Sequence, residues 1–170
     1  MNRRYLITGC SGGGKSTLID HLEARGHNVV HEPGLRIIRG GGPAPWEDRL
    51  GFFEAVTALS LADLDSPVSP DSPTFFDRGL LDALSGRAGR EKVPLASLMP
   101  PPFPYAQRVF FAPPWPEIFE QTEERPHSFE MARDEAQRLR RDLAALQIET
   151  VELPKISVEE RADLVLSLAT

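Results

Sequence analysis

At residues 9–16 the chain reads Gly9-Cys10-Ser11-Gly12-Gly13-Gly14-Lys15-Ser16. This stretch fits Gly-x-x-x-x-Gly-Lys-Ser/Thr, the phosphate-binding P-loop. The segment before it, residues 4–8, is apolar and β-prone, and residues 16–25 have the composition of a helix that ends at Gly26. A strand, a glycine-rich loop and a helix in this order form the context that a P-loop requires.

The chemistry of this loop follows from its backbone. Glycines let the chain wrap a polyphosphate because no Cβ stands in the way, and successive N–H groups form an anion nest at the start of a helix. We expect Lys15 to reach the β- and γ-phosphates, Ser16 to ligate Mg²⁺ and Thr17 to touch the α-phosphate. The predicted nucleotide-binding residues of the loop are Gly9, Ser11, Gly12, Gly13, Gly14, Lys15, Ser16 and Thr17.

The nucleotide is expected to be ATP. The chain contains no Asn/Thr-Lys-x-Asp segment, the signature of guanine binding, so GTP is the less favoured nucleoside triphosphate. The expected cofactors are therefore ATP and Mg²⁺.

The composition is that of a globular chain with an acidic balance. Of the 170 residues, 41% are hydrophobic and 26% are charged, and the formal net charge is −6. This length suffices for one domain, residues 1–170, with a hydrophobic core. The negative charge argues against binding to nucleic acid or to an anionic membrane. No apolar run has the length of a membrane span and the first strand leaves no room for a signal peptide, so we expect a cytoplasmic protein.

The one cysteine, Cys10, excludes an internal disulfide. It lies inside the P-loop, where the dipole at a helix N-terminus can lower the pKa of a thiol. The alternative is that Cys10 occupies a loop position without chemistry.

Strand-like and helix-like segments alternate along the chain. This order predicts an α/β fold of three layers, the P-loop NTPase fold, with a mostly parallel five-stranded sheet and a short helical lid near residues 115–130. Ligands are then expected at the carboxyl ends of the strands. After the first strand and helix, strands are predicted at 28–31, 74–77, 107–111 and 150–153, and helices at 35–39, 47–64, 80–88, 128–146 and 158–168.

Two charged residues follow the strand at residues 74–77. Asp77 ends that strand, where a P-loop protein needs a carboxylate to hold Mg²⁺ directly or through water. The alternative role is a cap for the next helix. Arg78 is predicted to clamp a phosphate or an anionic substrate, and the alternative is a surface ion pair.

Two further candidates follow the second strand. Glu32 ends the strand at 28–31, and we expect this strand tip to lie beside the P-loop strand, over an acceptor pocket. There Glu32 could accept the proton of an attacking hydroxyl, and Arg36, one turn later, could bind an anionic group of the acceptor. The alternatives are an exposed turn glutamate and a helix-surface arginine.

Two segments near the C-terminus complete the candidate site. Arg125 lies in a charged segment of the lid, where an arginine can neutralise charge that develops on the γ-phosphoryl group; the alternative is a solvated loop. Pro154 follows the fifth strand, in the loop that commonly passes over the nucleobase in this architecture.

These segments together resemble a known family. The chain looks like the small bacterial predicted ATPases of the AAA-domain type, a group similar to the nicotinamide riboside kinase domain of NadR. The segments that carry the resemblance are the P-loop, the His31–Arg36 segment, Phe75-Phe76-Asp77-Arg78-Gly79, the 109–116 segment and Leu153-Pro154. The resemblance covers nearly the whole chain. It implies a nucleotide-kinase-like fold, in which Asp77-Arg78 resembles the Asp/Glu-Arg pair and Glu32-Pro33 the Glu-Pro of nucleoside kinases, where the glutamate is the base.

The sequence thus predicts a Mg²⁺-dependent phosphotransferase that moves the γ-phosphoryl group of ATP to a hydroxyl of an unidentified small-molecule, nucleoside-like acceptor. Its predicted catalytic residues are Lys15, Glu32, Asp77, Arg78 and Arg125. The alternative is a nucleotide-dependent switch or NTPase, in which the bound nucleotide orders the lid so that a protein or lipid partner binds.

Overall fold

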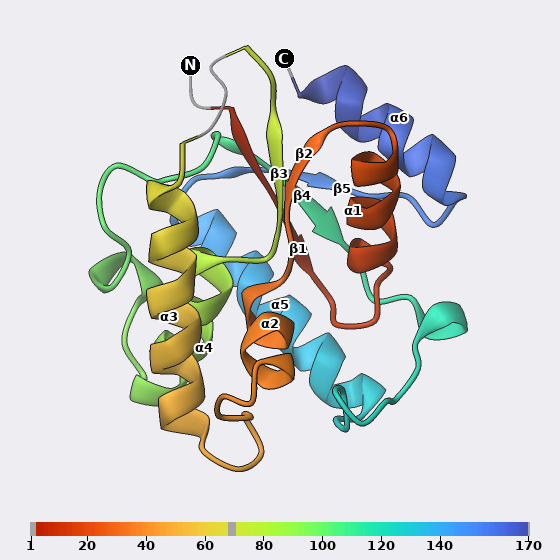
Figure 1. The fold of residues 1–170 in the computed structure, drawn as a ribbon. Coiled ribbons are helices and arrows are strands. Elements are labelled where there is room, and N and C mark those ends of the chain that lie inside the picture. The colour runs from red at the N-terminus through yellow and green to blue at the C-terminus, as the bar shows by residue number, and fades with distance from the viewer. Residues whose placement is uncertain (1–2, 68–70, 170) are drawn as a thin grey trace.

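The computed structural model describes residues 3–67 and 71–169. Its centre is a five-stranded sheet with the strand order β2-β3-β1-β4-β5, and every neighbouring pair is parallel (Figure 1). The predicted α/β fold is therefore confirmed. The strands are β1 Arg4–Gly9, β2 Asn28–Val30, β3 Thr74–Asp77, β4 Arg108–Ala112 and β5 Glu149–Glu152.

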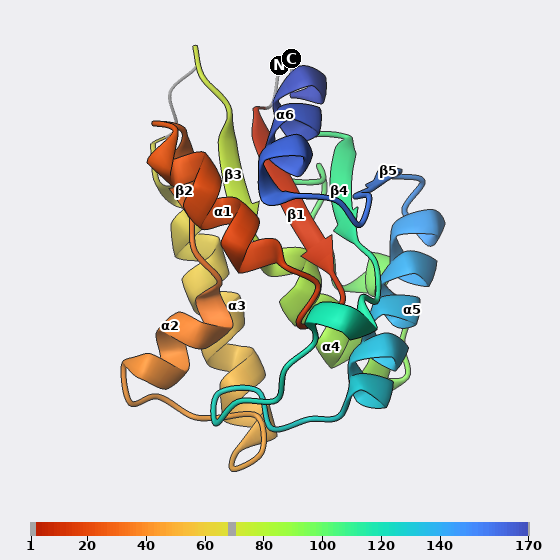
Figure 2. The same ribbon diagram turned by 90° about the vertical axis from the view of Figure 1, so that its right-hand side faces the viewer.

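Helices cover both faces of this sheet. Figure 1 shows α1 and α6 together on one side, with α3, α4 and α5 on the other, and Figure 2 looks onto the α1 and α6 side. The three-layer arrangement matches the prediction. The helices are α1 Lys15–Ala24, α2 Pro33–Arg39, α3 Arg49–Asp65, α4 Leu80–Glu91, α5 Phe129–Ala145 and α6 Val158–Leu168.

The core consists of two apolar clusters, one on each face of the sheet. Because side chains alternate along a strand, Leu6 of β1 packs with α4 and α5, whereas Tyr5 and Ile7 pack with α1 and α6. Phe75 and Phe76 of β3 divide in the same way between the two clusters. The central strands are thus buried on both faces, as expected for a parallel sheet.

The strand order corrects one expectation about β2. The tip of β2 was expected beside β1, but β3 lies between them, and β2 pairs with β3 alone. The physical reason is burial. The side chains of β3 are buried along its whole length and need strands on both sides, whereas Asn28 of β2 is exposed, as an edge strand allows.

Capping residues set several helix boundaries. The helix predicted from residue 47 begins at Arg49, because the Asp48 carboxylate accepts a 2.9 Å hydrogen bond from the N–H of Gly51. Ser157 and Glu160 form a capping box at the start of α6. None of the helices in residues 3–67 and 71–169 combines the length and apolar character needed to cross a bilayer.

The segment expected to form the lid has little regular structure. It contains the short 3-10 helix η2, Pro116–Ile118, and then a tight turn in which Thr122 and Arg125 exchange two backbone hydrogen bonds of 3.1 and 2.9 Å. Ser128 then caps α5. The prolines at 113 and 114 follow the end of β4, and the next α-helix begins at Phe129.

Candidate active site

The P-loop packs tightly against the end of β4. Gly9 has a φ of +117°, and a Cβ on it would lie 2.3 Å from the carbonyl oxygen of Ala112. That same oxygen accepts a 2.8 Å hydrogen bond from the N–H of Cys10. Gly9 is therefore required both for its backbone angle and for this close approach. The loop is held rigidly at its start, as a phosphate-binding loop needs to be.

Cys10 itself has no reactive character. Its side chain is fully buried, and burial raises the pKa of the thiol, while Lys15 and Arg78 only partly offset that effect. A buried thiol with a raised pKa holds its proton and is a poor nucleophile. Of the two interpretations of Cys10, the position without chemistry fits the structure.

Lys15 lies inside the loop. Its ammonium group donates a 2.7 Å hydrogen bond to the carbonyl oxygen of Cys10, and the side chain is almost completely buried. Burial lowers the pKa of Lys15, and the nearby guanidinium of Arg78 lowers it further. A polyphosphate in the loop would reverse this effect, because an anion favours the charged ammonium.

Ser16 and Asp77 form a pair of oxygen ligands that fits a divalent cation. The Ser16 hydroxyl donates a 2.8 Å hydrogen bond to Oδ2 of Asp77 at the end of β3. Asp77 is 1% exposed, and its Oδ1 has no hydrogen-bond partner in the part of the chain that the structure describes. A buried carboxylate oxygen without a partner is costly, and binding of Mg²⁺ directly or through water would satisfy it. Asp77 does not cap α4, since that helix begins after Gly79.

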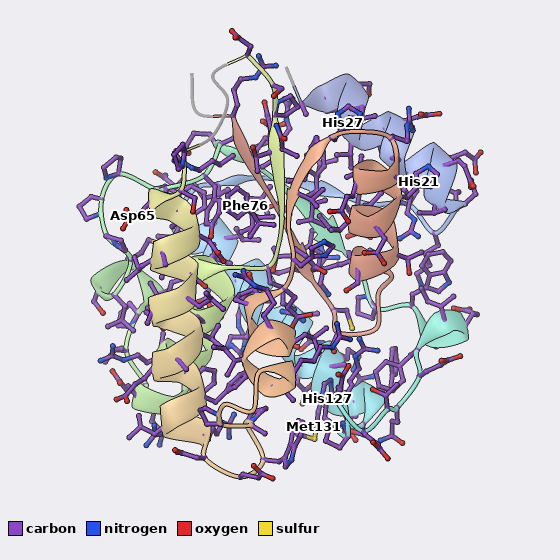
Figure 3. The ribbon with its side chains drawn as sticks, in the orientation of Figure 1. His21, His27, Asp65, Phe76, His127 and Met131 are labelled. Carbon is purple, nitrogen blue, oxygen red and sulfur yellow. The ribbon has the colours of Figure 1, made fainter. Side chains whose placement is uncertain are left out.

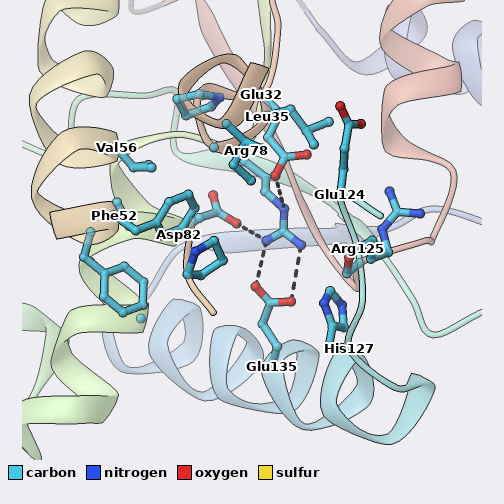
Figure 4. Close-up of a pocket in the computed structure, with 18 of the residues that line it drawn as sticks. Glu32, Leu35, Phe52, Val56, Arg78, Asp82, Glu124, Arg125, His127 and Glu135 are labelled. Carbon is cyan, nitrogen blue, oxygen red and sulfur yellow. Dashed lines mark hydrogen bonds and ion pairs between the residues drawn. The ribbon is translucent and has the colours of Figure 1, made fainter. Parts of the chain in front are cut away.

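Arg78 lies at the centre of a buried ion-pair network (Figure 4). Its guanidinium lies 2.8 Å from Asp82, 3.1 Å from Glu135 and 3.7 Å from Glu32. The backbone places it there by turning left-handed directly after β3, with a φ of 58°. Asp82 is held in turn by the hydroxyl of Thr8 and by the N–H of Gly79.

This network changes the charge state of its members. Burial raises the pKa of Glu32, although Arg78 acts in the opposite direction. Burial opposes ionisation of Glu135 too, but there Arg78 and Lys15 prevail and lower the pKa of the carboxyl. Burial works against the charge of Arg78, yet the three carboxylates around it raise its pKa. Burial raises the pKa of Asp82 as well, so two carboxyls of this network hold a proton readily. Because Thr8 and the N–H of Gly79 already donate to Asp82, Glu32 is the candidate base.

A cavity of about 560 Å³ adjoins the P-loop at Ser11. The ion-pair network forms its inner end, and the side chains around it are drawn in Figure 4. Apolar and aromatic side chains of α2 and α3 form one wall, and the lid forms another. The wall residues include Leu35, Ile38, Phe52, Phe53 and Val56, and the lid residues are Glu124, Arg125, Pro126 and His127.

The lid rests on the P-loop as well as on the cavity. A Cβ on Gly12 would lie 2.6 Å from the ring of Phe119, which shows how closely this ring covers the loop. Phe119 also contacts the ring of Phe129 edge to face, with centroids 5.3 Å apart. His127 and Met131 lie together at this end of the molecule, away from His21 and His27 (Figure 3). Arg125 of this segment lines the cavity.

Most predicted site residues lie together, but Arg36 does not. The predicted residues that lie in or beside the P-loop and the inner end of the cavity are Lys15, Ser16, Glu32, Asp77, Arg78 and Arg125. Arg36 was expected to bind an anionic group of the acceptor, but its guanidinium lies 2.7 Å from Asp63 of α3, and it does not line the cavity. Arg78, expected to clamp an anion, is already surrounded by carboxylates. Pro154 lies in the loop after β5, and its predicted contact with the nucleobase stays a prediction.

The structure adds residues that the sequence did not indicate. Asp82 and Glu135 hold Arg78, but no motif marks them, and Glu135 lies 57 positions away. Arg161 of α6 is buried beside the P-loop, where it donates a 3.3 Å hydrogen bond to the carbonyl oxygen of Gly14 and lies over the ring of Trp115. Arg161 is the one basic residue of α6, but no motif marks it.

This geometry agrees with comparisons with known proteins. The family model AAA_28, described as an AAA domain, matches residues 4–161. The chain belongs to the AAA_28 family. No curated protein matches this AAA_28 member.

Solved structures resemble the AAA_28 member over nearly its whole length. A NadR protein in complex with NR has 16% identity and a TM-score of 0.74, with 99% of this chain and 52% of that chain covered. The chain thus spans about half the length of that NadR protein.

Two kinases align over most of both chains. Shikimate kinase from Acinetobacter baumannii, in complex with shikimate, has 15% identity and a TM-score of 0.64, with 99% of this chain and 93% of that chain covered. Deoxyadenosine kinase from M. mycoides has 12% identity and a TM-score of 0.62, with 97% of each chain covered. At these identities the likeness shows the fold, and the AAA_28 member has a P-loop kinase-like fold.

Proposed function

We propose that this AAA_28 member is a phosphotransferase that moves the γ-phosphoryl group of ATP to a hydroxyl group of a small-molecule acceptor, with Mg²⁺ as cofactor. The observation that carries the proposal is the cavity itself. It adjoins the P-loop at Ser11 and contains Glu32 at the same end. A phosphotransferase needs a cavity for its acceptor beside the γ-phosphate of the bound nucleotide. A protein that only binds or hydrolyses the nucleotide does not need one.

The charges around the cavity favour an acceptor that reacts through a neutral group. Arg78 is already bound by Asp82, Glu135 and Glu32, so this end of the cavity has more carboxylates than guanidinium groups to pair them. A phosphate or carboxylate placed there would be repelled. A hydroxyl, in contrast, can donate a hydrogen bond to a carboxylate.

The apolar wall indicates the shape of the acceptor. Phe52 and Phe53 of α3 line the cavity together with Leu35 of α2, and these side chains provide flat and aliphatic surface. Pockets of this size bury most of a molecule with the dimensions of a nucleoside. We therefore propose a nucleoside-like alcohol as the acceptor.

The proposed reaction assigns a role to each side chain at the inner end. The acceptor oxygen attacks the γ-phosphorus, the bond between that phosphorus and the ADP oxygen breaks, and the hydroxyl proton passes to Glu32. Lys15 and Arg125 stabilise the charge on the transferring group. Ser16 and Asp77 would hold Mg²⁺, which neutralises charge on the phosphate oxygens when bound. Asp82 and Glu135 fix Arg78 and through it the position of Glu32.

The proposal is tested by a panel of small alcohols, including nucleosides, with ATP and Mg²⁺ in an assay for ADP formation and phosphorylated product. The expected result is slow ADP formation by the protein alone and a large stimulation by one class of alcohol, with one phosphorylated product per ADP. Equal ADP formation with and without every alcohol would contradict the proposal. In that case binding of a partner that depends on the γ-phosphate would favour a nucleotide-dependent switch.

A further inference from the structure

The helix α2 connects the inner end of the cavity with its lid. Glu32 immediately precedes this helix, and Arg39 is its last residue. Leu35 and Ile38, which lie between these two residues in the chain, line the cavity. An acceptor that packs against this face therefore touches an element whose two ends reach the proposed base and the lid.

The contact at the far end of α2 is a bidentate ion pair. Nε of Arg39 donates a 2.8 Å hydrogen bond to one carboxylate oxygen of Glu124, and Nη2 donates a 2.9 Å bond to the other. Within the described part of the chain no other ion pair joins the lid to α2. Two parallel bonds fix direction as well as distance, because the guanidinium and the carboxylate are both planar.

Glu124 transmits this constraint to its neighbour. It lies in the tight turn in which Thr122 and Arg125 are joined by two backbone hydrogen bonds. With the turn closed in this way, fixing Glu124 also fixes the backbone of Arg125. On the P-loop side the lid is held by Phe119, which covers Gly12, and by Trp115, whose ring lies under Arg161. The ion pair of Arg39 with Glu124 holds it separately to α2.

We propose that Arg39 is a positioning residue, whose ion pair with Glu124 ties the lid to α2 and so places Arg125 against the transferring group when an acceptor is bound. This inference rests on the proposed function for the role of Arg125, while the attachment of the lid can be tested without it. The hydrogen bonds from Arg39 lower the pKa of Glu124, as expected for a carboxylate held in its charged form.

The size of the effect follows from the exposure of the pair. The side chains of Arg39 and Glu124 are 63% and 37% exposed, so water and salt weaken their attraction. Pairs of this kind shift an equilibrium by about two- to fivefold. Loss of the pair is therefore expected to lower turnover by about that factor and to leave KM for ATP unchanged, because Arg125 acts on the transition state.

The test is a charge exchange in the full chain. The variants are Arg39→Glu, Glu124→Arg and the double variant Arg39→Glu/Glu124→Arg, with Arg87→Glu as a matched control, since Arg87 and Glu91 form an exposed pair remote from the lid. One readout is hydrogen exchange of the Thr122 and Arg125 amides with a non-hydrolysable ATP analogue and Mg²⁺. The other is turnover and KM with the alcohol found by the panel, at low and at high salt.

The expected result is faster exchange at both amides and lower turnover in each single variant, recovery in the double variant, and no change in the control. At high salt the differences should shrink. Exchange that is the same in all variants, or a double variant no better than the single ones, would overturn the proposal. If no alcohol is phosphorylated, the proposed function fails while the exchange readout still decides whether Arg39 holds the lid.

Discussion

The hydroxyl of Ser16 and the carboxylate of Asp77 meet at 2.8 Å, although 61 positions separate them in the chain. The parallel pairing of β1 with β3 brings them together, since Ile7 lies in register with Asp77 and the P-loop follows β1. A hydroxyl from the first turn of α1 and a carboxylate from the end of β3 thus lie side by side, and the second oxygen of that carboxylate has no partner among the described residues.

This pair predicts how the protein responds to Mg²⁺. Asp77→Asn should reduce the apparent affinity for Mg²⁺ in nucleotide binding by about 10- to 100-fold, because a neutral amide is a poor ligand for a hard cation. The measurement is a Mg²⁺ titration with a fluorescent ATP analogue. Asp163→Asn serves as the control, since Asp163 pairs with Arg25 at the surface. An unchanged titration for Asp77→Asn would exclude Asp77 from the metal site.

Removal of the Lys15 ammonium should affect the chemical step most. Lys15→Ala is expected to lower turnover by about 10²- to 10³-fold, as loss of a single charge-stabilising donor does in other enzymes. Steady-state kinetics with the acceptor, together with the affinity for the ATP analogue, separate this effect from weaker binding. Arg90→Ala, at an exposed position of α4, should behave as the wild type. Near-normal turnover of Lys15→Ala would argue against phosphoryl transfer at this loop.

The raised pKa of Glu32 predicts the pH dependence of the reaction. Glu32 can accept a proton only when it is deprotonated, and burial raises its pKa, so turnover should increase with pH through a range above that of an ordinary glutamate. Glu32→Gln should lower turnover by about 10²- to 10⁴-fold and remove this acidic limb. The pH profiles of kcat for both proteins provide the check. The control Glu47→Gln, at an exposed site, should keep the rise of kcat with pH. If Glu32→Gln also keeps this rise, a group other than Glu32 causes it.

Substitution of two glycines by alanine distinguishes the stability cost of backbone strain from that of steric contact. Gly9 and Gly26 both have positive φ, but a Cβ would meet the Ala112 carbonyl oxygen at 2.3 Å in Gly9 and nothing within 4 Å in Gly26. Gly26→Ala should therefore cost about 1 kcal/mol of unfolding free energy, and Gly9→Ala about 3 kcal/mol or more. Urea denaturation measures both. Equal losses of unfolding free energy in the two variants would mean that β4 can move away from residue 9 at little cost. The P-loop would then not be held against β4.

The donor half of the site could be predicted from the sequence because its signals are local. The P-loop is one continuous motif. Asp77 ends β3 and Glu32 follows β2 by two residues, and the order of elements determines the type and direction of both strands. Parallel strands bring their carboxyl ends to one edge, so residues at those ends become neighbours whatever lies between them.

The rest of the site depends on contacts that no local pattern contains. The sequence predicts that Arg36 and Arg78 bind anionic groups of a ligand, but Asp63 pairs with the first and three carboxylates surround the second. The place of β2 at the sheet edge also follows from tertiary packing, because a three-residue strand carries too little periodicity to indicate its neighbours. The cavity walls arise from the packing of α2 and α3, which lie in a region rich in glycine and proline.

The position of β2 at the edge of the sheet has a consequence for the diversity of such proteins. The P-loop and Asp77 depend on the inner strands β1, β3 and β4, where a substitution disturbs neighbours on both sides. The cavity wall depends on α2 and α3, attached to the edge strand and its flanks. Mutations in that wall should therefore leave the frame of the P-loop intact, and under the proposed function they would change the acceptor by altering one side of the molecule. Engineering of acceptor preference should accordingly begin at residues 35–56.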